Sequence, residues 1–241
     1  MRTRGLVIRT TGSWYTLACE DGEQRECRIR GRLRLRGVRS TNPVVVGDRV
    51  EAEQDEQGEW AICDIAPRHN YIIRRASNLS KESHIIAANV DRAMVVATIA
   101  EPVTATEFID RLLVTCEAYK VPATLLLAKS DLLSDRAEEV AEFHRTYEGA
   151  GYEVIDLSTV DGRGVECVRE LTRQGITLLS GNSGVGKSTL VRALNPALDI
   201  RTGDISESTG KGRHTTTFST MYPIGEGGYI IDTPGIKGFG L

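Results

Sequence analysis

Short apolar runs alternate with stretches of helical periodicity from about residue 90 onward. Such runs are typical of buried parallel strands, and the stretches between them place their apolar residues on one helix face. The expected strands cover residues 93–99, 123–127, 154–159, 176–180 and 228–231. The expected helices cover residues 106–119, 135–147 and 187–194. This alternation predicts an α/β domain on a largely parallel sheet.

The beginning of the chain follows a different pattern, with strand-like segments broken by Gly, Asp and Asn turns. The expected strands cover residues 5–9, 14–18, 24–29, 48–53 and 60–65. Five short strands in a segment of this length suit a small all-β barrel of the OB-fold type. We therefore predict a barrel domain over residues 1–67, a linker over 68–83 and an α/β domain over 84–241.

Residues 181–188 read Gly-Asn-Ser-Gly-Val-Gly-Lys-Ser, between a predicted strand and a predicted helix. This pattern is typical of a P-loop, in which glycines let backbone N–H groups surround phosphates and the helix N-terminus favours the anion. We expect Lys187 to reach the β- and γ-phosphates and to assist catalysis, and the Ser188 hydroxyl to ligate Mg²⁺. The predicted phosphate-binding residues are Asn182, Ser183, Gly184, Val185, Gly186, Lys187, Ser188 and Thr189.

A second motif, Asp-Thr-Pro-Gly at residues 232–235, follows the last predicted strand. An acidic residue at the carboxyl end of a neighbouring strand is where a P-loop enzyme holds Mg²⁺, usually through water. We therefore expect Asp232 to hold Mg²⁺ and the N–H of Gly235 to sense the γ-phosphate. The Gly-, Ser- and Thr-rich segment 202–217 predicts a loop that orders around the metal, with one threonine as ligand.

A motif for base recognition lies upstream of the P-loop, where the strand at 123–127 runs into Ala-Lys-Ser-Asp at 128–131. GTPases carry Asn-Lys-x-Asp here; Asp131 is expected to accept two hydrogen bonds from guanine, and the Lys129 stem to cover the base. The order along the chain is base motif, P-loop, Mg²⁺ switch and acidic strand, which predicts a circularly permuted P-loop GTPase domain. Expected backbone contacts to the guanine oxygen come from Ser158 and Thr159.

With this order the chain resembles the ribosome small-subunit-dependent GTPase A family of bacteria. The resemblance runs from the arginine-rich first domain through Gly-Arg-His-Thr-Thr-Thr at 212–217 to the motif at 232–235. It implies a Mg²⁺-dependent enzyme that hydrolyses GTP to GDP and phosphate during late assembly of the small ribosomal subunit, with that subunit and its rRNA as partners. It also implies that Thr216, rather than Thr215, ligates Mg²⁺.

Two features depart from the family pattern. Ala128 stands where the family has an Asn that contacts the purine and braces the P-loop, which predicts weaker nucleotide binding, although Asp131 should preserve guanine selectivity. Only six residues follow Gly235, too few for the second switch and the zinc module of family members, so we expect impaired hydrolysis. The five cysteines lack metal-ligand spacing, which predicts no zinc in this chain.

The candidate for orienting the attacking water is His214. Many GTPases have a Gln directly after Asp-x-x-Gly, but Ile236 stands there and an aliphatic side chain cannot orient water. His214 lies beside the expected Mg²⁺ threonine, and a solvated loop histidine is an equally weighted alternative.

Residues 1–50 carry eleven arginines and five acidic residues, although the net charge of the chain is −3. A basic first domain on an acidic chain predicts a polyanionic partner. Five arginines alternate with apolar or glycine residues, so a strand would present them on one face. We favour rRNA binding by this face over a charged edge that resists aggregation. These residues are Arg28, Arg30, Arg32, Arg34 and Arg36.

The chain has no signal-like N-terminus and no apolar run near about 18 residues, and an odd cysteine count fits a reducing compartment. These features predict a cytoplasmic protein with no membrane partner, and we expect a monomer. Two other classes stay open: an RNA-binding module with a passive, weakly hydrolysing nucleotide switch, and a P-loop ATPase or small-molecule kinase. Lys129 and Asp131 at a strand end disfavour the last.

Overall fold

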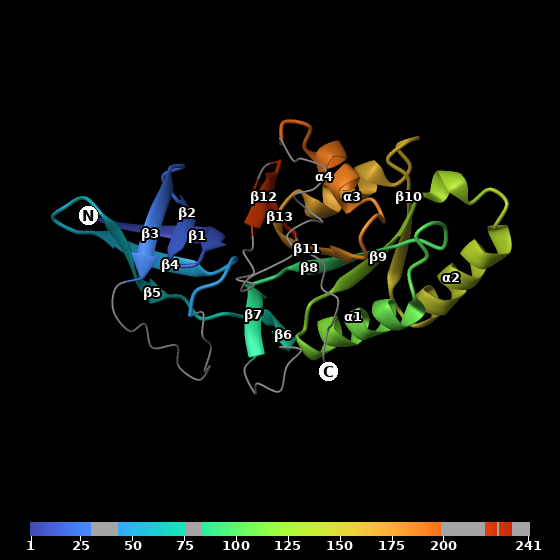
Figure 1. Cartoon of the computed structure of the whole chain (residues 1–241), viewed down its shortest axis with the longest axis horizontal. Helices are drawn as coiled ribbons and strands as arrows, with labels where there is room; N and C mark the ends of the chain where they lie inside the picture. The colour runs from blue at the N-terminus through green and yellow to red at the C-terminus, as the bar shows by residue number, and fades with distance from the viewer. Residues whose placement is uncertain (30–42, 76–82, 199–219, 226, 233–241) are drawn as a thin grey trace, which may run out of the picture. The chain divides into compact units, whose positions relative to one another are not determined.

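The computed structural model describes residues 1–29, 43–75, 83–198, 220–225 and 227–232 (Figure 1). The described residues form two compact units. One comprises the described part of residues 1–90 together with 220–221, and the other comprises 91–198 and the described part of 222–232. Within these ranges, no helix is both long enough and apolar enough to cross a membrane.

The first unit contains a five-stranded barrel. Strand β1 pairs with both β2 and β4, β2 pairs with β3, β3 pairs in parallel with β5, and β5 returns to β4, so the ring closes. Residues on alternate positions point inward, and the core includes Val7, Leu17, Cys27, Val50 and Ile62. The predicted OB-type barrel is therefore confirmed. Its strands are β1 (Arg2–Thr11), β2 (Trp14–Cys19), β3 (Gln24–Ile29), β4 (Arg49–Gln54) and β5 (Trp60–Ile65).

An antiparallel hairpin follows the barrel and belongs to the same compact unit. Its strands are β6 (Tyr71–Arg75) and β7 (Ser83–Ala88), so β6 lies in the segment 68–83 that we expected to be a linker. The hairpin packs against residues 43–48 through Val45, Ile85 and Ala88. Gly47 makes this approach possible: its φ is +88°, and a β-carbon there would lie 2.0 Å from the carbonyl oxygen of Ala88.

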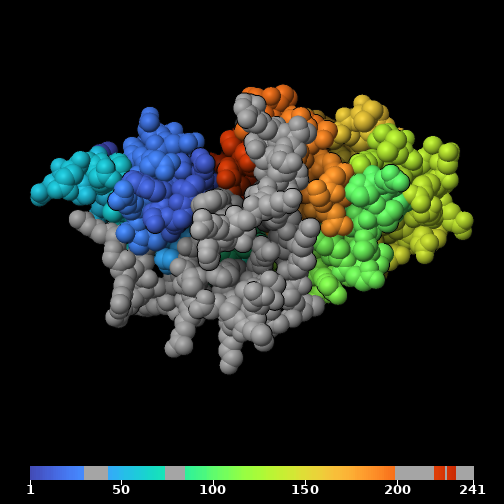
Figure 2. Space-filling model, in the orientation of Figure 1, coloured from blue at the N-terminus to red at the C-terminus, as the bar shows by residue number. Residues whose placement is uncertain are grey.

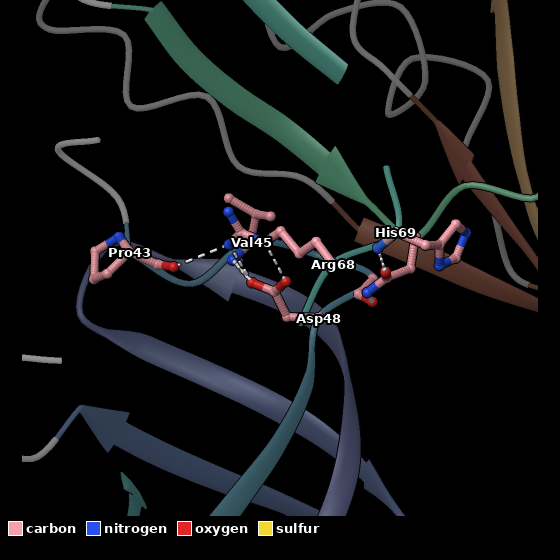
Figure 3. A network of polar contacts seen from close by, with 7 residues as sticks. Pro43, Val45, Asp48, Arg68 and His69 are labelled. Atoms are coloured by element: carbon pink, nitrogen blue, oxygen red, sulfur yellow. Dashed lines mark hydrogen bonds and ion pairs between the residues drawn. The ribbon is translucent and has the colours of Figure 1, made fainter. Parts of the chain in front are cut away.

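A buried ion pair fixes the segment between barrel and hairpin (Figure 3). Arg68 donates from Nε and Nη2 to the two carboxylate oxygens of Asp48, each at 2.6 Å, and from Nη2 to the carbonyl of Pro43 at 3.0 Å. Asp48 is fully buried and also accepts a hydrogen bond from the N–H of Val45 at 2.9 Å. The fork geometry of the guanidinium and these extra hydrogen bonds satisfy both charges.

Replacing Arg68 with methionine is expected to lower the free energy of unfolding by about 3–5 kcal/mol, because the Asp48 carboxylate would stay buried without its counter-ion. Urea denaturation measures this. Arg4→Met is the control: its pair with Glu51 is exposed to solvent and should contribute little. Equal stability losses in the two variants would show that burial does not set the strength of the Arg68 contact.

The second unit is built on strands in the order β10-β9-β8-β11-β13-β12, of which β12 contributes its residues from 222 onward. Neighbours from β10 to β13 run parallel, as predicted. The predicted strand at 154–159 is too long, because β10 ends at Leu157 and the chain turns at Ser158. We did not predict β12. The strands are β8 (Arg92–Ala97), β9 (Ala123–Ala128), β10 (Glu153–Leu157), β11 (Gly175–Gly181), β12 (Thr220–Ile224) and β13 (Gly228–Asp232).

Helices cover both faces of this sheet (Figure 1). On one side, α1 (Thr106–Ala118) and α2 (Ala137–Gly149) bury residues such as Leu112 and Phe143. On the other side, α3 (Val165–Thr172), which we did not predict, and α4 (Lys187–Leu194) pack on the strands through an apolar cluster. A short 3₁₀ turn, η1 (Ser130–Leu132), follows β9.

His144 links α2 to β10. Its Nδ1 lies 2.8 Å from a carboxylate oxygen of Glu148, and its Nε2 lies 3.0 Å from a carboxylate oxygen of Asp156. Partial burial lowers the pKa of His144, but the hydrogen bonds to Asp156 and Glu148 outweigh burial and raise the pKa above its usual value. The protonated imidazole therefore stabilises the folded chain.

This contribution should be fully present below about pH 6.5, the usual pKa of an unfolded histidine, and should be lost as pH rises through the folded pKa. The difference in unfolding free energy between the native chain and His144→Gln is therefore expected to shrink from pH 5.5 to pH 8.5. Denaturation at several pH values measures it. Asp156→Asn, which removes one partner, should flatten the pH dependence; an unchanged dependence in that variant would contradict this assignment.

Candidate nucleotide-binding site

The P-loop connects β11 to α4, as the sequence predicts. Gly184 and Gly186 have φ values of +82° and +105°, in the left-handed region that glycine adopts without strain. The loop therefore turns sharply before Lys187, the first residue of α4. The partial positive charge at the N-terminus of α4 makes this loop a favourable place for a phosphate group.

Lys187 is held inside the P-loop. Its side chain is 5% exposed, and Nζ donates hydrogen bonds to the carbonyl oxygens of Gly181 at 2.7 Å and Asn182 at 2.8 Å. These two carbonyls partly compensate the buried ammonium group. Ser188 follows in the first turn and is half-buried, whereas Ser183 and Thr189 are exposed. The loop thus combines a buried cation with hydroxyl groups near its surface.

Strand register brings the other predicted residues to the same edge of the sheet. Gly181 at the end of β11 pairs with Val96 of β8, and Leu127 of β9 pairs with Ala97 of β8. The last residues of β9 and β10, Ala128 and Leu157, are partners. The loops that leave these four strands therefore start side by side, although they are far apart in sequence.

The base motif begins where β9 ends. Lys129 has a left-handed backbone, with φ of +59°, and Asp131 is half-buried in η1. Ala128 is buried in the same apolar cluster as Val185 of the P-loop. On the face drawn in Figure 2, the orange surface around α4 borders green surface from an earlier part of the unit. The structure therefore brings the base motif close to the P-loop.

The predicted contact after β10 has a defined backbone. Ser158 is buried, and its hydroxyl accepts hydrogen bonds from the N–H groups of Val160 at 3.1 Å and Asp161 at 3.3 Å. This arrangement is a Ser turn, which fixes the chain directly after the strand. Thr159 is half-buried in that turn.

Several predicted site residues lie outside the described part of the chain. The backbone of Asp232 ends β13 and pairs with Leu179 of β11, so this strand ends near the same edge. Within the described ranges, no three His, Cys, Asp or Glu side chains are grouped so that they could hold a metal ion. The predicted residues outside those ranges are His214, Thr216, Gly235, Arg30, Arg32, Arg34 and Arg36.

On the barrel, Arg28 is exposed in β3 and its guanidinium carbon lies 3.9 Å from the ring centre of Trp14. Arg25, which the sequence did not single out, lies 5.1 Å from the ring centre of Trp60. Both are cation–π contacts between neighbouring strands. Tyr15, by contrast, is buried in the barrel core. Only the pairing of β3 with its neighbours could have revealed these stacks.

The strands can be renumbered from the P-loop strand β11, continuing through β12 and β13 and then from β8 to β10, as if the chain were circular. The sheet order β12-β13-β11-β8-β9-β10 then reads 2-3-1-4-5-6. This is a doubly wound order, in which ligands bind at the carboxyl ends of the strands. The fold and the P-loop together define a circularly permuted P-loop GTPase preceded by a small barrel.

The sequence comparisons identify the family. The protein-family model described as RsgA GTPase matches residues 65–241, and the family model described as RsgA N-terminal domain matches residues 4–62. The chain belongs to the RsgA GTPase family.

Individual relatives agree with this assignment. A protein of Bacteroides fragilis named small ribosomal subunit biogenesis GTPase RsgA is 51% identical over 98% of this chain and 77% of its own length. The crystal structure of YjeQ from Thermotoga maritima superposes with a TM-score of 0.74 and 33% identity, over 98% of this chain and 75% of that chain. YloQ, described as a circularly permuted GTPase, gives a TM-score of 0.67 at 26% identity, over 99% and 73% of the two chains.

Proposed function

We propose that this chain is a GTPase that acts in biogenesis of the small ribosomal subunit. One observation carries the proposal: the base motif and the P-loop leave adjacent parts of one sheet edge, with Ala128 and Val185 in one apolar cluster. A single guanine nucleotide can then contact both motifs. The names of the relatives supply the ribosomal context.

Within this site we assign the phosphates to the P-loop and to Lys187, and the guanine base to Asp131, Lys129 and the backbone of Ser158 and Thr159. Hydrolysis is assigned to a water molecule oriented by His214, with the Gly235 N–H at the γ-phosphate. Support for the first two assignments comes from the buried Lys187 ammonium and from the turn that fixes Ser158.

Mg²⁺ is the metal that the site should use. Ser188 is half-buried in the first turn of α4, and its hydroxyl oxygen suits a hard cation beside bound phosphates. We assign Thr216 and Asp232 as the further ligands, with Asp232 acting through water. When bound, the ion would neutralise charge on the β- and γ-phosphate oxygens.

We assign rRNA binding to the barrel domain within residues 1–67 and nucleotide binding to the domain within 84–241. The exposed Arg28 stacked on Trp14 supports the first assignment, because a guanidinium on an aromatic ring offers both charge and a flat apolar face. The chain is expected to act as a monomer in the cytoplasm.

Single-turnover hydrolysis of GTP, with and without purified small ribosomal subunits, tests this proposal. We expect the subunits to raise the rate at least about tenfold, since a partner that orders the catalytic groups stabilises transition-state charge. ATP should be hydrolysed far more slowly under both conditions. A chain that binds GTP and the subunit without any rise in rate would instead be a passive nucleotide switch, and preferred ATP turnover would indicate an ATPase.

A further inference from the structure

The loop between β8 and α1, residues 98–105, binds Lys129 of the base motif and lies close to Gly184 of the P-loop; we call it the brace. We propose that Arg136 is a positioning residue that fixes the brace, and that the brace holds Lys129 in place beside the P-loop. The inference rests on the proposed guanine nucleotide site and identifies how this chain keeps the two halves of that site aligned.

The brace has a shape of its own. The N–H of Thr104 donates to the carbonyl of Thr98 at 2.8 Å, and the N–H of Thr98 donates to the hydroxyl of Thr104 at 3.1 Å. The N–H of Ala100 donates to the hydroxyl of Thr98 at 2.9 Å. Both threonines are buried. These hydrogen bonds fix the conformation of the loop, so a residue that binds one part of the loop also helps to position the rest.

Two side chains from the segment after β9 bind the backbone of the brace. Lys129 donates from Nζ to the carbonyl of Glu101 at 2.6 Å, and Arg136 donates from Nη1 to the carbonyl of Ile99. Hydrogen bonds from charged donors are stronger than those between neutral groups. The Lys129 side chain therefore has a fixed direction as long as the brace stays in its place, and Arg136 fixes that place.

Another part of the brace, Pro102, lies close to the P-loop. A β-carbon placed on Gly184 would lie 3.5 Å from Cγ of Pro102, at ordinary van der Waals distance. The proline ring therefore lies beside this exposed P-loop glycine. From Lys129 through Glu101 and Pro102 to Gly184, one short loop connects the base motif with the phosphate loop.

This connection matters because the last residue of β9 cannot make a polar side-chain contact with the P-loop. Ala128 contributes only a buried methyl group to the cluster that it shares with Val185. It has no side-chain donor or acceptor for the P-loop backbone. A polar contact of the base motif comes instead from Lys129, which donates to the brace at Glu101, and Arg136 binds the brace at Ile99.

Arg136→Met tests the proposal. We expect its affinity for GDP to fall about tenfold, and its KM for GTP to rise with little change in kcat, because the base motif loses alignment while the catalytic groups stay intact. Arg136 also pairs with Glu139 at 2.8 Å. Glu139→Gln is therefore the matched control, which removes that ion pair alone and should bind GDP as the native chain does.

A second substitution separates positioning from general destabilisation. Ala128→Asn supplies an amide at the end of β9, and in the Arg136→Met background it should recover most of the lost GDP affinity. If Arg136→Met does not fold, Arg136→Lys, which keeps the charge but loses the planar fork, is measured in the same way. Native GDP affinity in a folded Arg136 variant would overturn the inference, as would equal losses in Glu139→Gln.

The base selectivity of Asp131→Asn distinguishes an error in the proposed guanine nucleotide site from an error in the brace inference. If Asp131→Asn abolishes guanine selectivity while the Arg136 variants bind normally, the site is right and the brace is wrong. If Asp131→Asn leaves guanine selectivity unchanged, the site itself is wrong, and the brace inference is overturned with it.

Discussion

Replacing Lys187 with methionine is expected to weaken binding of GDP and GTP about 100-fold or more and to reduce GTP hydrolysis to background. Each hydrogen bond from a charged donor contributes about 1.5–3 kcal/mol, and a tenfold change in affinity corresponds to about 1.4 kcal/mol. The Lys187 ammonium is already buried against the carbonyls of Gly181 and Asn182, at the start of the loop that should hold the phosphates. Isothermal titration calorimetry measures the affinities.

Lys120→Met is the matched control for this prediction. Lys120 is exposed and precedes β9, at the opposite edge of the sheet from the P-loop. Its replacement removes the same charge and should change neither affinity nor turnover. If Lys187→Met bound GDP as tightly as Lys120→Met does, the P-loop lysine would have no part in phosphate binding.

The Asp131→Asn variant should exchange guanine selectivity for xanthine selectivity. The guanine N1–H and amino groups both donate to the carboxylate, whereas a carboxamide accepts only on one side and meets the amino group with its own N–H. Xanthine has a carbonyl in that place and restores the pairing. A site built to pair a donor rejects a base that lacks it by several orders of magnitude. We therefore expect a loss of GDP affinity of about 100-fold or more and a gain for xanthosine diphosphate.

Asp135→Asn provides the comparison, because Asp135 lies four positions further along the chain and is exposed to solvent. Competition binding with GDP, xanthosine diphosphate and ADP distinguishes the variants. A preference for GDP that survives in Asp131→Asn would mean that another group reads the base.

The sequence locates the nucleotide motifs well because each couples an apolar run to glycine or charged residues directly after it. β11 extends one residue beyond the predicted 176–180 at each end, and α4 covers the predicted residues. The end of β10 is harder to place, because Ser158 can either continue a strand or start a turn. Its hydroxyl bonds two N–H groups ahead of it, which favours the turn.

Features that depend on contacts between residues far apart in the chain could not be predicted from the sequence. The run Tyr-Ile-Ile at 71–73 is short, and β6 forms because its hairpin with β7 packs on Val45. The buried pair of Arg68 and Asp48 could not be predicted from residues twenty positions apart. The brace uses the backbone carbonyls of Ile99 and Glu101 as hydrogen-bond acceptors. Every residue has such a carbonyl, so the residue types do not reveal which ones are used.

The central claim is that the permuted sheet assembles one guanine nucleotide site from a base motif and a P-loop that stand in reversed order along the chain. Equilibrium affinities of the native chain for GDP, GTP, ADP and ATP, in one buffer containing Mg²⁺, test it most directly. We predict that the guanine nucleotides bind about 100-fold more tightly than the adenine nucleotides. Equal affinities, or tighter binding of ADP and ATP, would contradict the claim.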